Sequence, residues 1–354
     1  MKHPSMIGAI YGLASAALFG ASTPLAKLLL GEIDPWMLAA VLYLGAGIGL
    51  AVLLGVQRIQ NKRLTETPLR GEDLPWLFGA ILAGGVVGPV LLMIGMTTTP
   101  ASSAALLLNL EGLATLSIAW LVFRESVDAR ILLGAAAILA GAALLSWGGE
   151  VGWLSVGALA IVGACLAWGV DNNLTRNLSH ADPVQITLAK GLVAGGINLA
   201  LALGRGASLP PIDLTLAAGG VGFLGYGVSL VLFVLALRHV GTARTGAYFS
   251  AAPFLGAVLG VVLLSEPVTW KVIAAAALMG VGLYLHVVER HDHEHEHEEL
   301  EHEHAHVHDE HHQHAHRPDV APDEPHAHSH RHTPLIHSHP HFPDQHHRHG
   351  HKNS

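Results

Sequence analysis

The chain has 354 residues, of which 51% are hydrophobic and only 13% are charged. This composition is too apolar for a soluble domain of that length and indicates an integral membrane protein, and no part of it is basic enough for nucleic-acid binding. The net charge of −8 belongs to residues 291–354, which hold 4 Lys and Arg against 13 Asp and Glu together with 23 of the 27 histidines, and the single cysteine excludes an internal disulfide.

Apolar stretches follow one another from the N-terminus to residue 288. A membrane-spanning helix needs about 20 apolar residues. The first stretch has that length and lacks the early small-residue cleavage site of a signal peptide. We predict ten spans, at residues 7–30, 35–56, 74–96, 100–123, 131–147, 153–174, 183–203, 214–237, 242–264 and 268–288. The predicted fold class is therefore all-α integral membrane, with ten transmembrane helices.

Basic residues in the loops predict the orientation, because cytoplasmic loops carry an excess of Lys and Arg. With the N-terminus inside, nine basic residues fall on the cytoplasmic side and only Lys27, Arg205 and Lys271 on the other. We therefore expect a multi-pass protein of the plasma (inner) membrane whose two termini, and hence its tail, face the cytoplasm.

The apolar part of the chain contains an internal duplication. Residues 97–147 return, altered, as residues 239–286, and each copy has a helix breaker, Gly112 or Pro253, followed by a turn with a glutamate, Glu125 or Glu266. Each half has five spans, so the second half must enter the bilayer in the opposite orientation. Inverted repeats of this kind build midplane sites in secondary transporters. The predicted domains are residues 7–147 and 153–288, followed by a tail at 291–354.

The doubled pattern of a small-polar helix, a breaker, a turn reading RES or SEP, and an Ala/Gly-rich closing helix resembles the drug/metabolite transporter superfamily, EamA type, over residues 7–288. The resemblance implies two inverted five-helix repeats around a central cavity, with the fifth helix of each half at the periphery. Relatives carry amino acids, other metabolites, sugars and drugs. The chain departs from many relatives at Glu111, where an uncharged residue is more usual.

Glu111 is the first candidate site residue, since it lies roughly 12 residues into its span and therefore near the midplane. An ionisable side chain there costs about 3 kcal/mol and is a functional candidate by default. It can bind a cationic group or take up a proton. The alternative is a protonated glutamate that only hydrogen-bonds a neighbouring helix.

Asp171 and Lys190 are the second candidate feature, because they lie at similar depth in the sixth and seventh spans. We expect them to pair. A buried ion pair locks two helices together, and this is the interpretation that we favour here. The alternative is a gate or proton relay that opens when Asp171 is neutralised.

Uncharged polar residues of five spans are the further candidates for lining a cavity. Each alone is more typical of interhelical contacts, but the set predicts a polar passage. The residues are Ser22, Thr23, Asn109, Asn172, Asn173, Tyr226, Ser229, Tyr248 and Ser250.

The tail differs in composition from the rest of the chain, with too little apolar surface to fold, so we predict that it is disordered. Neutral imidazole suits Zn, Ni, Co and Cu, and His-x-His spacing lets a flexible chain surround one ion. The tail also matches the H-E-x-x-H protease pattern, but that motif needs a stable helix, so no enzyme is predicted. The expected metal ligands are His291, His293, His295, His297, His302, His304, His306, His308, His311, His312, His314 and His316.

Three functions remain open. The first is a secondary transporter that exports a small metabolite or drug and needs no cofactor, with the tail as a metal-binding accessory. The second is a Ni, Co or Zn efflux permease whose tail collects the ion, although residues 7–285 offer only His180, His239 and Cys165 as soft ligands. The third is a non-transporting metal buffer or sensor. The expected partners are a small-molecule substrate, the bilayer and transition-metal ions, and a homodimer is allowed.

Overall fold

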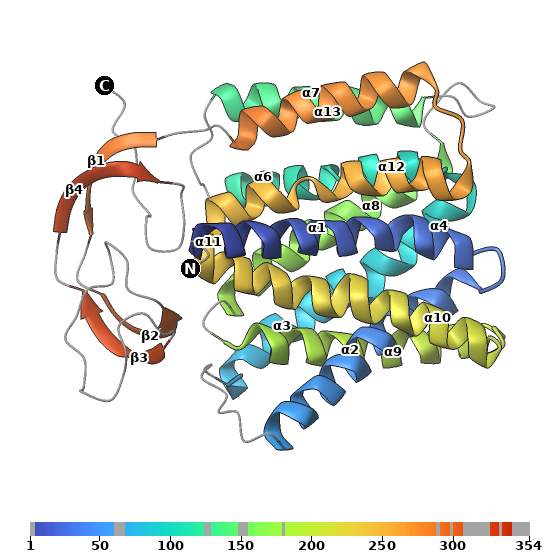
Figure 1. The fold of residues 1–354 in the computed structure, drawn as a ribbon, viewed down its shortest axis with the longest axis horizontal. Helices are drawn as coiled ribbons and strands as arrows, with labels where there is room; N and C mark the ends of the chain where they lie inside the picture. The colour runs from blue at the N-terminus through green and yellow to red at the C-terminus, as the bar shows by residue number, and fades with distance from the viewer. Residues whose placement is uncertain are drawn as a thin grey trace.

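The computed structural model describes residues 4–59, 68–123, 129–147, 155–178, 181–287, 291–297, 300–306, 326–332 and 335–341. Up to residue 287 the regular structure is helical, as the long apolar stretches dictate, and the helices run back and forth in one bundle (Figure 1). The first half contains α1 (Pro4–Leu29), α2 (Pro35–Ile59), η1 (Gly71–Asp73), α3 (Leu74–Ala80), η2 (Ile81–Val87), α4 (Gly88–Thr98), α5 (Ala101–Leu107), α6 (Leu110–Phe123) and α7 (Ala129–Ser146). The second contains α8 (Val156–Thr175), η3 (Arg176–Leu178), α9 (Pro183–Gly204), α10 (Ile212–Gly222), η4 (Phe223–Val228), α11 (Ser229–Phe249), α12 (Ala252–Leu264) and α13 (Trp270–Val287).

Seven helical runs in the described part of the chain are long and apolar enough to cross a membrane. They are Met6–Leu29, Pro35–Val56, Gly71–Thr98, Ala101–Val122, Val156–Leu178, Pro183–Gly204 and Ile212–Ala236. Three further apolar helices are shorter, namely Leu132–Ser146, Ala252–Leu264 and Trp270–Leu285. The expected number of ten crossings therefore requires that the three shorter helices also span.

Equivalent helices of the two halves begin in the same way. The Asp34 carboxylate accepts hydrogen bonds from the backbone N–H groups of Trp36 and Met37, at 2.9 and 3.2 Å, at the start of α2. Asp182 accepts one from Val184 N–H at 2.8 Å at the start of α9. The first amides of a helix lack intrahelical partners, so each Asp caps its helix.

The two halves also share their irregularities. The segments η2 and η4 are single wide π-turns inside longer helices, and both lie in the third span of their half. Short breaks at residues 108–109 and 250–251 then interrupt the fourth span of each half. A π-turn is rare, so its recurrence in the same span of both copies is strong evidence of duplication.

Helix α11 includes the predicted boundary between the eighth and ninth spans. The rings of Phe233 and Phe249 lie 5.0 Å apart between centroids, whereas 16 residues of straight helix span about 24 Å. The chain therefore reverses direction between these two residues, where the sequence predicts a turn.

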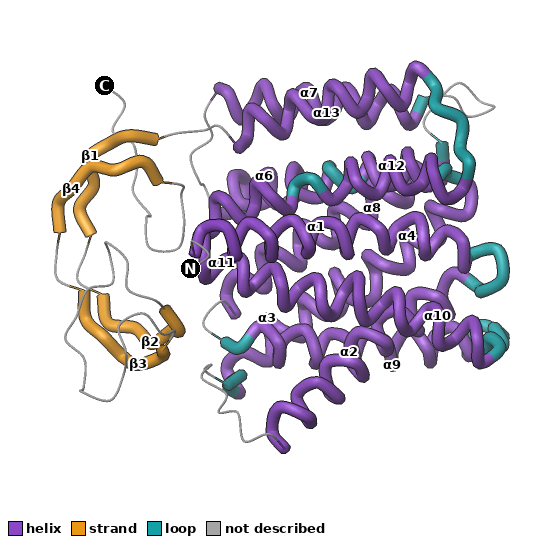
Figure 2. The backbone as a smooth tube through the Cα atoms, in the orientation of Figure 1, coloured by secondary structure: helices purple, strands orange, loops and turns teal. Residues whose placement is uncertain are grey.

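Helices from opposite halves pack directly on one another. Helix α2 crosses α9 so closely that a Cβ added to Gly191 would lie 2.6 Å from the backbone nitrogen of Gly47. Helix α1 packs against α11, and α7 lies beside α13 along one edge of the bundle (Figures 1 and 2). Small residues permit such backbone contact in membranes. The core of the bundle thus lies at the interface between the two halves.

Regular structure is described in four short stretches of the tail, whose predicted disorder stays a prediction. Four short strands are described, β1 (His291–His297), β2 (Leu300–His306), β3 (His326–His332) and β4 (Leu335–His341). β1 pairs antiparallel with β4, and β2 with β3 (Figure 2). Alternation of His with other residues has the two-residue period of a strand. From the sequence alone, the same alternation indicates only a spacing that suits metal binding.

Candidate functional site

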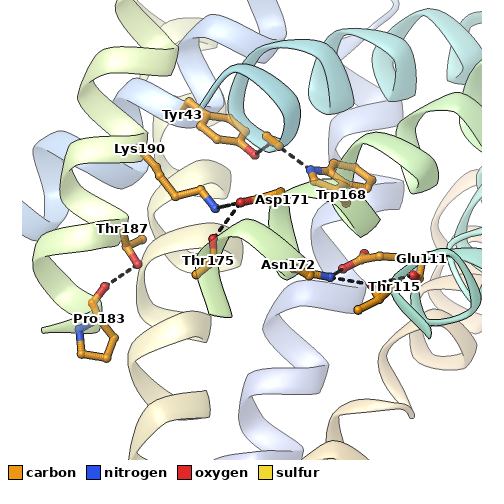
Figure 3. A network of polar contacts seen from close by, with 11 residues as sticks. Tyr43, Glu111, Thr115, Trp168, Asp171, Asn172, Thr175, Pro183, Thr187 and Lys190 are labelled. Atoms are coloured by element: carbon orange, nitrogen blue, oxygen red, sulfur yellow. Dashed lines mark hydrogen bonds and ion pairs between the residues drawn. The ribbon is translucent and has the colours of Figure 1, made fainter. Parts of the chain in front are cut away.

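The C-terminal end of α8 connects two polar clusters (Figure 3). Successive residues of a helix point in directions about 100° apart. Asp171 accordingly faces Lys190 on α9, whereas Asn172 faces Glu111 on α6 (Figure 3). The structure thus brings four of the predicted site residues together at one level of the bundle.

The first cluster surrounds Glu111, in the first turn of α6 just after the break in the fourth span. Asn172 donates a hydrogen bond from Nδ2 to Glu111 Oε1 at 3.0 Å and to Thr115 Oγ1 at 3.1 Å. Thr115 in turn donates to the Glu111 carbonyl oxygen at 2.9 Å. The residues that the structure describes place no Lys, Arg or His in an ion pair with this carboxylate.

Glu111 and Asn172 lie at the surface of the bundle. Glu111 is half-buried and Asn172 is exposed. The next residue, Gly112, is also exposed, and a Cβ added to it would meet no atom within 4 Å. The hydrogen-bonded pair is therefore not enclosed in the packed core.

The second cluster is the ion pair of Asp171 and Lys190. Lys190 Nζ lies 2.6 Å from both carboxylate oxygens, and Thr175 Oγ1 donates to Asp171 Oδ1 at 2.9 Å. The side chains are only 7% and 18% exposed. Gly84 of η2 packs against the pair, because a Cβ there would overlap the Asp171 carboxylate. The charge of Asp171 is thus compensated inside the protein, unlike that of Glu111.

The wide turn η2 presents its carbonyl oxygens to side chains of three other helices. Gly84 O accepts from Tyr43 OH on α2 at 2.7 Å and from Trp168 Nε1 on α8 at 2.9 Å. Gly85 O accepts from Asn198 Nδ2 on α9 at 2.9 Å. The sequence analysis does not predict these three donors. A Tyr, a Trp and an Asn within apolar spans nevertheless indicate hydrogen bonds to a neighbouring helix.

Aromatic rings continue from Tyr43 across the bundle. Tyr43 stacks on Tyr226 at 5.7 Å between centroids, and Phe19 meets Tyr226 edge-on at 5.9 Å and Phe249 at 5.3 Å. All four rings are half-buried. They join α1 and α2 of the first half to η4 and α11 of the second.

Several predicted cavity residues instead bond to backbone or to one another. Ser22 donates to Phe19 O at 2.6 Å, and Asn173 donates to the carbonyl oxygens of Thr115 and Gly169 at 3.1 and 2.8 Å. Ser229 and Ser15 bond reciprocally between α11 and α1. The bonds of Asn173 to Thr115 and of Ser229 to Ser15 join neighbouring helices, whereas the bond of Ser22 lies within α1.

The remaining predicted cavity residues are scattered. Asn109 donates to Leu106 O at 2.8 Å, and Thr23 is buried. Tyr248 packs on Gly12, and Ser250 lies in the break that precedes α12. None of the four belongs to the two polar clusters of α8.

The predicted metal ligands have a partly defined arrangement. His293 and His295 of β1 lie opposite His339 and His337 of β4, and His302, His304 and His306 of β2 lie opposite His330, His328 and His326 of β3. His291 and His297 also belong to β1. The positions His308, His311, His312, His314 and His316 lie outside the described residues, as does Glu125. Among described residues no group of three or more His, Cys, Asp or Glu side chains gathers as a metal site.

Known proteins match the chain over its helical part. A profile described as the EamA-like transporter family matches residues 6–147 and 155–288. An uncharacterised transporter of Methanothermobacter thermautotrophicus is 28% identical over 274 residues, which are 73% of this chain and 80% of that protein. The uncharacterised inner membrane transporter YedA of Escherichia coli K12 is 27% identical over 280 residues, 71% of this chain and 83% of its own. One solved crystal structure shares the fold, with a TM-score of 0.58 at 19% identity over 79% of this chain and 95% of the other.

Proposed function

This chain belongs to the EamA-like transporter family and is a multi-pass membrane transporter, not an enzyme, and we propose that it exports a small organic metabolite or drug by alternating access. The solute site lies beside Glu111 and Asn172, where α6 and α8 meet. The observation that carries this assignment is a carboxylate near the middle of the fourth span that is only half-buried, accepts a hydrogen bond from the exposed Asn172 and forms no ion pair with a Lys, Arg or His of the described residues.

The mechanism rests on two inverted five-helix domains, residues 7–147 and 153–288, that cross the bilayer ten times in all. The matching π-turns, helix breaks and aspartate caps of the two halves support this arrangement. In inverted-repeat transporters, discontinuous helices meet at the midplane, and one half rocks against the other around the site. The breaks near Asn109 and Ser250 are positioned to serve as those discontinuities.

The charge of Glu111 selects the chemistry of the cargo. Asn172 supplies the Glu111 carboxylate with a neutral hydrogen bond, and Thr115 bonds only the backbone carbonyl of Glu111, so the carboxylate is left to meet a cationic group or a proton. The half-buried aromatic rings of α1, α2 and η4 offer apolar surface to the rest of a solute. A small organic molecule with a positively charged group fits both features.

Transition-metal efflux is the weaker candidate. The described helices hold no cluster of metal-binding side chains, and Asp171 is already paired with Lys190. The histidine tail favours a metal role outside the passage, because opposed histidines on neighbouring strands suit imidazole-preferring ions such as Zn, Ni, Co or Cu. We assign the tail to metal binding and not to cargo transfer.

We place the protein in the plasma (inner) membrane with both termini in the cytoplasm. The excess of Lys and Arg in the loops on the terminal side supports this orientation. The inner-membrane location of the relative YedA supports the compartment.

The test compares strains that lack the gene and are restored with the full chain, with residues 1–290 or with Glu111→Gln. Growth is measured on a panel of amine drugs and amino acids and on toxic Ni, Co and Zn. We expect the full chain and residues 1–290 to restore resistance to at least one organic compound equally. Glu111→Gln should lower that resistance by about tenfold or more, because a charged hydrogen-bond partner of the cargo is lost.

The matched control is Glu32→Gln, which neutralises an exposed glutamate in the turn between α1 and α2 and should leave resistance unchanged. Glu111→Gln should not change protein level, since the amide oxygen of Gln still accepts from Asn172. Metal would be the cargo if the deletion strain were sensitive only to metals and if residues 1–290 failed to restore its metal resistance.

A further inference from the structure

The turn between α4 and α5 is held from two sides by charged residues of other helices. Glu266, which follows α12, accepts hydrogen bonds from Ala101 N–H at 2.5 Å and Ser102 N–H at 2.9 Å. These are the first amides of α5 and have no partner within their own helix. A carboxylate at that place is also favoured by the helix dipole. The sequence identifies Glu266 as part of the repeat but does not indicate that it caps a helix of the other half.

Lys27 of α1 holds the other side of the same turn. Its ammonium group donates to the carbonyl oxygens of Met96 and Thr97 at the end of α4. Cations are favoured at helix C-termini. The two charges of opposite sign therefore complement the two helix ends that meet at this turn.

The contact made by Glu266 joins the two halves of the molecule. Glu266 belongs to the second half and α5 to the first. Ser265 adopts a left-handed backbone conformation, with φ of 51°, which ends α12 and sets the direction of the residue after it. One turn earlier, α12 touches α5 so closely that a Cβ on Gly260 would lie 2.8 Å from Ser102 N. On this face of the bundle the halves are in direct backbone contact.

This face lies opposite the start of α1 and the end of α13 (Figure 1). We propose that Lys27 and Glu266 form a latch that closes the solute passage on this face and opens once in each transport cycle, an inference that rests on the proposed function. When the halves separate here, water can replace Glu266 at the freed amides of α5. Opening of the latch therefore does not leave the first backbone N–H groups of α5 buried without a hydrogen-bond partner.

Thr99 provides a reporter for the latch. It lies in the turn itself, is 6% exposed, and its hydroxyl has no hydrogen-bond partner among the described residues, so Thr99→Cys replaces it with little loss. The single native cysteine, Cys165, is buried in α8 and is changed to Ala in the reporter protein. The full chain is placed in lipid nanodiscs, where a charged maleimide reaches both faces, and its rate of reaction with Thr99→Cys is measured.

We expect Glu266→Gln and Lys27→Met each to raise that rate by about tenfold or more, because a charge-assisted contact present only in the closed state is lost. Glu32→Gln, which removes an exposed glutamate on the same face, should leave the rate unchanged. An unchanged rate in Glu266→Gln would overturn the latch.

A second measurement separates opening from unfolding. In chains that keep Cys165 and lack the reporter, Glu266→Gln should leave the buried Cys165 unreactive. If Cys165 became reactive together with Thr99→Cys, Glu266 would be a structural cap and the latch would be wrong. Neither measurement needs a cargo, so a protein with a working latch and no organic substrate would contradict the proposed function alone.

Discussion

Asp171 and Glu111 are carboxylates of neighbouring helices that meet very different partners. Asp171 is held by Lys190 at 2.6 Å and by Thr175, whereas Glu111 accepts a hydrogen bond from the amide of Asn172 and forms no ion pair with a described residue. Desolvating two opposite charges together is tolerable only when both stay paired. The ion pair thus joins α8 to α9, and the same helix end presents Asn172 to Glu111.

The ion pair makes a residue-level prediction about stability. Asp171→Asn leaves the Lys190 charge buried without its partner, so we expect the unfolding free energy of the purified protein to fall by about 3–5 kcal/mol. The double variant Asp171→Asn, Lys190→Met removes both charges and should recover most of that loss. Denaturant unfolding in detergent measures all three proteins. A double variant no more stable than Asp171→Asn would contradict the assignment of a structural lock.

At the level of elements, the wide turn η2 determines how α2, α8 and α9 meet. Its carbonyl oxygens take hydrogen bonds from Tyr43, Trp168 and Asn198. Side-chain donors matter more in a membrane, where water cannot satisfy a freed carbonyl. Gly84 is required at this turn because the Asp171 carboxylate occupies the space of a Cβ.

Gly84→Ala should therefore be costly despite the small change in volume. The added methyl group displaces the Asp171 carboxylate from Lys190, and we expect a loss of about 1–3 kcal/mol. Gly196→Ala is the matched control, since a Cβ there meets nothing within 4 Å and alanine favours a helix. Thermal unfolding of the two variants should separate them. Equal melting temperatures would show that η2 tolerates a side chain.

Hydropathy and the repeat predict the order of the helices well, because span length and loop composition are local properties. The π-turns are not predictable in this way, since they depend on contacts with other helices. The same limit applies to Tyr43 and Trp168, whose common partner Gly84 O comes from a third segment. Glu111, Asp171 and Lys190 can be predicted as candidate site residues because charged side chains are rare in apolar spans. The polar set is less informative, since Ser229 and Asn173 bond to neighbouring helices and Ser22 bonds within its own helix.

At the scale of the whole molecule, the halves are interleaved. Helix α1 packs against α11, α2 against α9, and α7 beside α13 (Figure 1). The interface between halves is therefore the core, and any passage must open by movement along it. The latch at Glu266 joins the halves on one face, while Glu111 and Asn172 lie deeper, where the two polar clusters of α8 meet.

The most direct test of alternating access is the reactivity of Asn172→Cys, in a Cys165→Ala background, toward a membrane-impermeant maleimide. The reagent is applied to right-side-out and to inside-out vesicles, with Val258→Cys on the exposed apolar side of α12 as the matched control. We predict that Asn172→Cys reacts from both faces of the membrane, because the site opens to each face in turn, while Val258→Cys reacts from neither. Labelling of Asn172→Cys from one face only, or from neither, would contradict the account.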